Sequence, residues 1–134
     1  MRTCYLGLLV VLWACADPVA STLCACSPVE PAVEVRGTLV SATGMPQPGK
    51  RVRALRSPLP CTAFLEDGGL GPLTDSTGYV RLLVFGSPTD SLCVRFLMRD
   101  NIVGAPEQEL SDTVRLRPTL PPYAIVTVLL VLPP

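Results

Sequence analysis

One segment in the middle of the chain, residues 74–84, restricts the fold more than any other. A polar turn, Thr74-Asp75-Ser76-Thr77-Gly78, is followed by a run in which apolar residues recur at every second position. Alternation with period two is typical of a half-buried β-strand, because successive side chains of a strand point to opposite faces of its sheet. We expect two rows of side chains, one facing the core (Val80, Leu82 and Val84) and one facing outward (Tyr79, Arg81 and Leu83).

Further alternating runs are separated by segments rich in turn-forming residues. The strands that we expect besides 79–84 are 33–39, 51–56, 92–99, 113–117 and 124–132. Fifteen prolines and ten glycines among 134 residues disfavour long helices. About seven short strands with frequent turns predict an all-β fold, a two-layer antiparallel β-sandwich.

The last expected strand, Ala124 to Leu132, is apolar on both faces. Such a strand is expected in the centre of a sheet or under a covering segment. If it were neither, its unpaired backbone groups would make it an edge prone to association. It is too short to cross a membrane as a helix, which needs about 20 residues.

The N-terminus has the pattern of a secretory signal. Met1-Arg2 supplies a positive charge and precedes an almost unbroken apolar run from Leu6 to Ala14. The run is much shorter than the roughly 20 residues of a membrane-spanning helix. We therefore predict an exported protein with a signal peptide (1–14), a flexible leader (15–32) and a folded domain (33–134).

Two processing routes fit the residues that end the signal. Ala14-Cys15-Ala16 offers the small residues that an ordinary signal peptidase reads, which would give a secreted or periplasmic protein. Leu12-Trp13-Ala14-Cys15 resembles a bacterial lipobox, in which Cys15 would carry a lipid anchor. Loss of Cys4 with the signal and acylation of Cys15 would leave four of the six cysteines, an even number that suits disulfides in an exported protein.

Cys61 and Cys93 belong to the expected folded domain, and we predict that they form a disulfide. Cys61 lies in a long irregular segment, 57–71, which would need to be pinned, and Cys93 lies on the outer side of strand 92–99. The core-facing row of that strand is expected to be Leu92, Val94, Phe96 and Met98. The redox state of Cys24-Ala25-Cys26 stays open, because one spacer residue strains a mutual disulfide and zinc sites use longer spacings.

The composition excludes several functions. The chain has no histidine, so Ser-His-Asp and Cys-His catalytic sites cannot form. Eleven basic residues balance eleven acidic ones, so strong attraction to nucleic acid is not expected. The carboxylates of Glu66-Asp67 and of Glu107 and Glu109 lie in expected loops, where we interpret them as solvated charges rather than as an acid–base pair. We expect no enzyme activity, no metal and no cofactor.

Three motifs resemble the carboxypeptidase regulatory-like domain. They are Val35-Arg36-Gly37-Thr38-Leu39-Val40, Gly44-Met45-Pro46-Gln47-Pro48-Gly49-Lys50-Arg51-Val52 and Thr74-Asp75-Ser76-Thr77-Gly78-Tyr79-Val80-Arg81-Leu82. The resemblance covers roughly residues 33–117, with 124–132 as a final strand. It implies a transthyretin-like, prealbumin-type Greek-key sandwich of about seven strands that serves as a non-catalytic module. Val80 departs from the family pattern, which more often has an aromatic residue there.

The turns within these motifs also have a physical explanation. Gly44 belongs to a turn-rich connection, and Gly49 and Gly78 stand where a positive φ is expected, which glycine adopts at little cost. Asp75 can accept backbone hydrogen bonds across its turn. We expect Asp75 to order this turn rather than to bind calcium, because no EF-hand-like ligand series surrounds it.

Exposed arginines give one candidate binding site. Arg81, Arg95 and Arg99 are expected on the outer sides of strands, with Arg115 and Arg117 beside them, and could form a basic patch for an anionic surface or glycan. The simpler interpretation, which we favour, is solvated arginines with acids nearby. Aromatic platforms for sugar binding are scarce in the expected domain, since Tyr79 and Tyr123 are its only tyrosines.

These patterns leave two functional hypotheses ahead of an enzyme. The first is a non-catalytic exported module, with or without a lipid anchor, that binds a protein or glycan at the cell surface. The second is a structural or assembly accessory that docks through its apolar C-terminal strand. No nucleic acid is expected as a partner, and a membrane only through the lipid anchor.

Overall fold

The computed structural model describes residues 28–66 and 69–134 of the chain. The predicted signal peptide and most of the predicted leader, with Cys15, Cys24 and Cys26, lie outside these residues. The described part contains strands and turns and no helix. Its strands are β1 (Ala32–Val40), β2 (Lys50–Pro58), β3 (Leu65–Glu66), β4 (Tyr79–Phe85), β5 (Leu92–Asp100), β6 (Gln108–Leu116) and β7 (Ala124–Val131).

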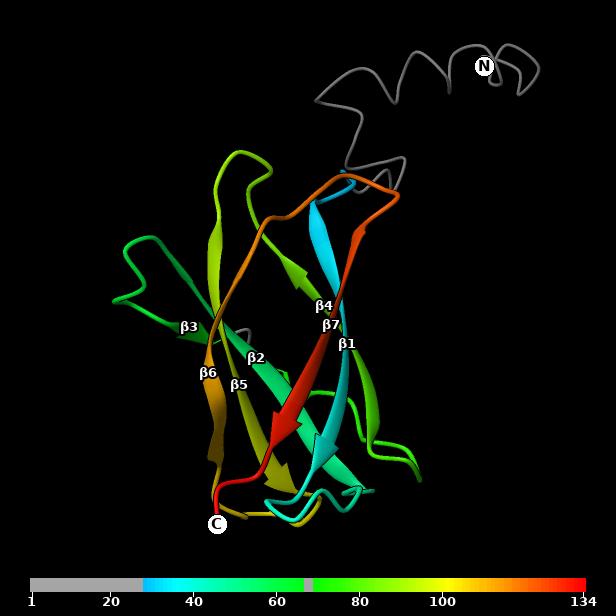
Figure 1. The fold of residues 1–134 in the computed structure, drawn as a ribbon. Coiled ribbons are helices and arrows are strands. Elements are labelled where there is room, and N and C mark those ends of the chain that lie inside the picture. The colour runs from blue at the N-terminus through cyan, green and yellow to red at the C-terminus, as the bar shows by residue number, and fades with distance from the viewer. Residues whose placement is uncertain (1–27, 67–68) are drawn as a thin grey trace, which may run out of the picture.

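The strands form two sheets that pack face to face (Figure 1). Sheet A has the order β4-β1-β7, and sheet B has the order β3-β2-β5-β6. The predicted two-layer β-sandwich is therefore confirmed. All pairs are antiparallel except one: β1 and β7 run parallel, with Val33 opposite Ala124 and Val40 opposite Val131. Period-two alternation fixes the facing of side chains but not strand direction, so the sequence could not reveal this pair.

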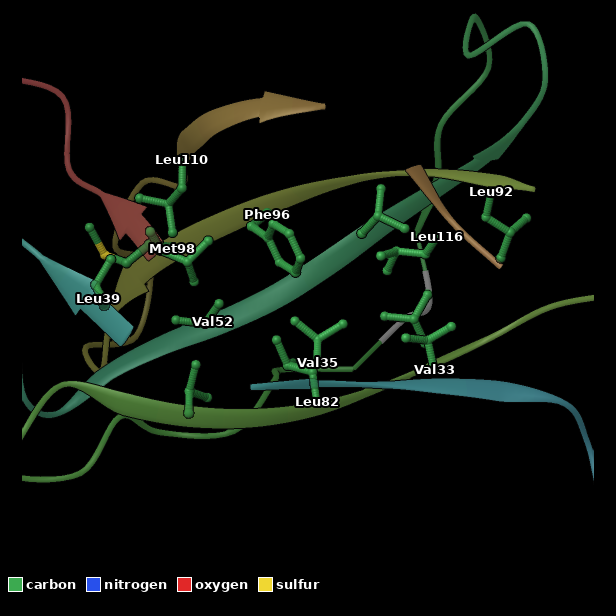
Figure 2. Packing of buried hydrophobic residues seen from close by; sticks show 14 residues of the cluster. Val33, Val35, Leu39, Val52, Leu82, Leu92, Phe96, Met98, Leu110 and Leu116 are labelled. Atoms are coloured by element: carbon green, nitrogen blue, oxygen red, sulfur yellow. The ribbon is translucent and has the colours of Figure 1, made fainter. Parts of the chain in front are cut away.

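The core lies between the two sheets and consists almost entirely of aliphatic side chains. The predicted inward row of β4 is buried, with Val80 2%, Leu82 8% and Val84 1% exposed. The predicted inward row of β5 (Leu92, Val94, Phe96 and Met98) is buried as well. In Figure 2 the Phe96 ring points from β5 toward Val35 and Leu82 of the facing sheet. A core of this kind supplies the main favourable term for folding, which is apolar surface removed from water.

The turn before β4 has the geometry that the sequence predicts. Gly78 has φ +77°, and a Cβ at this position would lie 2.4 Å from the carbonyl oxygen of Leu39. The predicted positive φ is confirmed at Gly49 as well, and Gly44 also has a positive φ. The Oδ1 atom of Asp75 accepts hydrogen bonds from the backbone N–H of Thr77 (2.8 Å) and of Tyr79 (3.0 Å). The hydrogen bond from the Thr77 hydroxyl, followed by these two backbone bonds, favours the charged carboxylate and so lowers the pKa of Asp75.

Two sequence predictions about strands need correction. The expected connection 101–112 ends early, because β6 begins at Gln108 rather than at Thr113. The first half of β6 contains Leu110 as its only apolar residue before Thr113, so it shows no alternating pattern, yet Leu110 is fully buried. The short strand β3 was not predicted either, because two residues carry no periodicity.

The prediction for the last strand was also wrong. β7 lies at an edge of sheet A, not in its centre, and no other described strand covers its outer face. Its inner face packs on the core through Leu130, Val126 and Val128, whereas its outer face is exposed. Burial within the described chain therefore explains only the inner face of β7. The apolar outer face is exposed, and an exposed apolar surface is a candidate binding surface.

Candidate interaction surface

The free edge of β7 has a defined set of backbone groups. The N–H of Leu132 donates to the carbonyl of Val40 at 2.9 Å, which fixes the phase of the pairing with β1. Because the N–H and C=O of one strand residue point to the same side and alternate along the strand, every second residue of β7 turns these groups away from β1. The residues whose backbone groups point to the open edge are Ile125, Thr127, Leu129 and Val131.

The same four residues also turn their side chains to the outside of sheet A. Ile125 is 53%, Leu129 64% and Val131 37% exposed, and Thr127 is exposed too. The strand has no charged residue from Ala124 to Val131. Most proteins protect an edge strand with charges, prolines, bulges or a covering segment. Within the described residues β7 has none of these, so the edge can accept another strand.

The outer face of sheet A continues the apolar surface beyond β7. Leu83 is 42% and Tyr79 is 37% exposed on β4, the opposite edge of the sheet. The outer face also carries a charged cluster, made of Glu34 and Arg36 on β1 and Arg81 on β4. The outer face of sheet A therefore combines exposed apolar side chains on β7 and β4 with a charged cluster.

Glu34 is the buried member of this cluster, 6% exposed although it points to the outer face of β1. Its two oxygens each bind one arginine: Oε1 accepts from Arg36 Nε and Oε2 from Arg81 Nη2, both at 2.7 Å. The hydrogen bonds from Arg36 and from Arg81 lower the pKa of Glu34 against the opposing effect of burial. Arg36 and Arg81 lie directly opposite each other on neighbouring strands, so Glu34 also relieves their mutual repulsion.

We expect Glu34→Gln to lower the melting temperature at pH 7 by about 3–6 °C, because the neutral amide leaves two opposed arginines without a shared anion. The folded-state pKa of Glu34 is lowered, so its contribution is complete above its ordinary pKa of 4.5 and is lost as the pH falls through the folded value. The melting curves of the two proteins should therefore converge in acid. A difference that stays constant between pH 7 and pH 3 would contradict this role.

The disulfide that the sequence predicts is confirmed. Cys61 and Cys93 are bonded, with their Cα atoms 5.5 Å apart. Cys93 lies on the outer side of β5, as expected, and is nevertheless fully buried, because the segment that carries Cys61 covers it. Ser57 lies beneath the same segment and accepts a hydrogen bond from the N–H of Ala63 at 3.2 Å. The disulfide thus holds a lid over one end of the outer face of sheet B.

The three arginines of the predicted basic patch do not meet. Arg81 lies on β4 in sheet A, whereas Arg95 and Arg99 lie on β5 in sheet B. Arg81 is therefore on one outer face of the sandwich and the other two arginines are on the opposite outer face. Arg81 binds Glu34. Arg95 lies over the Phe64 ring, 4.2 Å from its centre, and its Nε is 3.5 Å from an oxygen of Glu109. For Arg81 and Arg95, the interpretation as arginines with acids nearby therefore holds.

The carboxylates that were considered for catalysis have structural partners. Glu66 and Glu107 both bind the Nη2 atom of Arg53. Glu66 Oε1 lies 3.3 Å from it and Glu107 Oε2 lies 2.5 Å from it. The hydrogen bond from Arg53 lowers the pKa of Glu107, which disfavours the protonated form that a general acid needs. Asp67 lies outside the described residues. Nowhere in the described part do three or more acidic or cysteine side chains gather in a way that could hold a metal ion.

No protein family, no curated protein and no solved structure matches the chain. Residues 28–66 and 69–134 contain no helix with the length and hydropathy needed to cross a membrane.

Sequence reasoning missed two features of this surface. Glu34 was not singled out from the sequence, although an acid two residues before Arg36 on an expected strand could have indicated an ion pair on the outer face. The open edge of β7 was anticipated only by the docking-strand hypothesis, because the strand itself was expected in the centre of a sheet or under a covering segment. The absence of any charge from Ala124 to Val131 was the available signal for it.

Proposed function

We propose that the chain is a non-catalytic, exported β-sandwich module that binds another protein through the open edge of β7 and the neighbouring outer face of sheet A. The observation that carries the proposal is the uncharged edge strand, whose outward side chains and edge-facing backbone groups belong to the same four residues. In β-strand addition, backbone hydrogen bonds of this kind supply affinity and the alternate side chains supply specificity. The exposed leucine, isoleucine and valine side chains suit an apolar partner strand.

This proposal combines the module and the docking-strand hypotheses and favours a protein over a glycan as partner. Sugar-binding sandwiches present exposed aromatic platforms, whereas here Tyr79 is only 37% exposed and Tyr123 is partly buried. The resemblance to carboxypeptidase regulatory-like domains supports the same kind of role. Seven strands in two packed sheets and the glycine turns at positions 49 and 78 agree with the fold that this resemblance implies.

Export is part of the proposal and has one structural support. The Cys61–Cys93 disulfide fits an oxidising compartment, because such bonds are rare in reducing ones. Mass spectrometry of the mature N-terminus distinguishes the two processing routes: a diacylglyceryl group on Cys15 identifies a lipoprotein, and an unmodified end near Ala16 identifies ordinary secretion. Recovery of the whole chain with Met1 and a reduced Cys61 would contradict export.

Site-specific photo-crosslinking in the producing cells tests the proposed surface. A benzophenone side chain in place of Leu129 is expected to capture a protein partner, because Leu129 is 64% exposed at the open edge. The matched control is the same side chain at Thr113, an exposed strand position on β6 in sheet B. Capture from both positions alike, or from neither, would contradict a partner bound at β7.

A single charge at the edge gives the corresponding loss of function. Leu129→Lys should weaken partner binding at least about tenfold, because a lysine at an edge must be desolvated before another strand can pair there. Its melting temperature should stay within about 2 °C of the original value, since surface substitutions away from the core change stability little. Thr113→Lys should leave binding unchanged. Unaltered binding by Leu129→Lys would exclude strand addition at this edge.

A further inference from the structure

The sandwich contains two pairs of arginines that face each other across neighbouring antiparallel strands. Arg36 lies opposite Arg81 in sheet A, and Arg51 lies opposite Arg99 in sheet B. Like charges directly opposite each other destabilise a strand pair. The two pairs therefore pose the same electrostatic problem, and the protein itself shows one solution to it.

The solution in sheet A is a carboxylate that both arginines share. Each oxygen of Glu34 accepts one hydrogen bond at 2.7 Å, one from Arg36 and one from Arg81. Hydrogen bonds between guanidinium and carboxylate groups are among the strongest in proteins, because both partners are charged. One carboxylate is thus enough to satisfy a cross-strand arginine pair in this fold.

The pair in sheet B has no such carboxylate among the described residues. Arg51 binds only neutral groups, with Nε donating to Asn101 Oδ1 at 2.8 Å and Nη1 to the carbonyl of Gly71 at 3.0 Å. Arg99 has neither an ion pair nor a hydrogen bond with any side chain of the described part. The nearby acids form their ion pairs with other residues: Asp100 binds Lys50, and Glu107 binds Arg53, although the charge of Glu107 also acts on Arg99 from a longer distance.

Both arginines line one pocket, of about 170 Å³, that opens to solvent. Leu70, Ile102 and Val103 supply its apolar wall, and Ile102 and Val103 are strongly exposed. The bonds from Arg51 to Asn101 and Gly71 hold the two loops that carry this wall. The volume is well below the roughly 300–1,000 Å³ of sites for drug-sized molecules, so the ligand must be small or be one end of a larger molecule.

We propose that this pocket binds a carboxylate that carries a short apolar group. Its two oxygens would take the place that the oxygens of Glu34 occupy in sheet A, one toward Arg51 and one toward Arg99, and the apolar group would lie against Leu70, Ile102 and Val103. Asp100 also lines the pocket, and its pairing with Lys50 limits its repulsion of an anion. A free short-chain acid and the C-terminal residue of a peptide share this chemistry.

Titration of the full-length disulfide-bonded protein, followed by NMR of the Arg51 and Arg99 side chains, tests the site. N-acetyl-leucine is expected to bind, and N-acetyl-leucinamide, which lacks the carboxylate, to bind at least about tenfold more weakly. Tighter binding of a tripeptide that ends in leucine with a free carboxylate would identify peptide termini as the source, and tighter binding of hexanoate would identify free acids. Equal binding of the amide would overturn the proposal, as would inorganic phosphate binding as tightly as N-acetyl-leucine.

Two substitutions at one position separate ligand binding from stability. Arg99→Gln should weaken N-acetyl-leucine binding about tenfold, whereas Arg115→Gln, an exposed arginine on β6, should leave it unchanged. Arg99→Glu places a carboxylate of the chain itself beside Arg51, so it should abolish binding and raise the melting temperature. The proposal would be overturned if Arg99→Glu had a lower melting temperature than the original protein. It would also be overturned if Arg99→Gln bound N-acetyl-leucine as tightly as the original protein does.

Discussion

Replacing Cys61 and Cys93 together by alanine is expected to lower the free energy of unfolding by about 3–4 kcal/mol. The disulfide closes a loop between residues 32 positions apart, which restricts the unfolded chain, and the chain-entropy estimate for such a loop gives this value. The loss is large beside the roughly 5–15 kcal/mol total stability of a typical domain. Urea denaturation of the oxidised protein and of the double variant measures it.

The matched control for this prediction is the unaltered protein in the presence of a reductant. It should lose a similar free energy, because it too lacks the cross-link, while its two thiols still fill the space beneath the covering segment. A loss below about 1 kcal/mol in both samples would contradict restriction of the unfolded chain as a main source of stability.

Replacing Phe96 by alanine is the second substitution with a large expected effect, a loss of about 3–5 kcal/mol in the free energy of unfolding. Phe96 is fully buried and is the largest side chain at the centre of the core, where it reaches from β5 toward Val35 and Leu82 (Figure 2). Its removal forfeits apolar burial and leaves a cavity that two hydrogen-bonded sheets cannot readily close.

The neighbour of Phe96 on the same strand serves as its control. Leu97 points to the outer face of β5 and is only partly buried, so Leu97→Ala should cost about 1 kcal/mol or less. Thermal or urea denaturation of the two variants compares them directly. Equal losses would mean that the phase of β5 differs from the one described.

The facing of side chains could be predicted from the sequence, because it depends only on period-two alternation within each strand. Alternation correctly predicted the buried rows of β4 and β5 and the outward position of Cys93. The turn at Gly78 was predicted from its turn-forming residues. The start of β6 could not be found from alternation. Its first two residues, Gln108 and Glu109, carry exposed polar side chains, and only then does Leu110 enter the core.

The candidate surfaces could be predicted less well, because they depend on which strands become neighbours. Alternation assigns Arg81 and Arg99 to outer faces, but only the sheet order places them on opposite sides of the sandwich. The same holds for the cross-strand pairs of arginines, which follow from register, and for the edge position of β7. A strand that is apolar on both faces has the same sequence pattern in two cases: its second face can be covered by the chain itself or by another protein. The pattern alone does not distinguish them.

Amide hydrogen exchange along β7, followed by NMR on the purified monomeric protein, tests the open edge most directly. The amides of Val126, Val128 and Leu130 face β1 and should exchange slowly, whereas those of Ile125, Thr127 and Leu129 should exchange at least about tenfold faster because they face solvent. Addition of the crosslinked partner, once identified, should slow the second set alone. Equal protection of both sets in the monomer would show that the chain covers its own edge, and the account of β7 as a docking strand would be wrong.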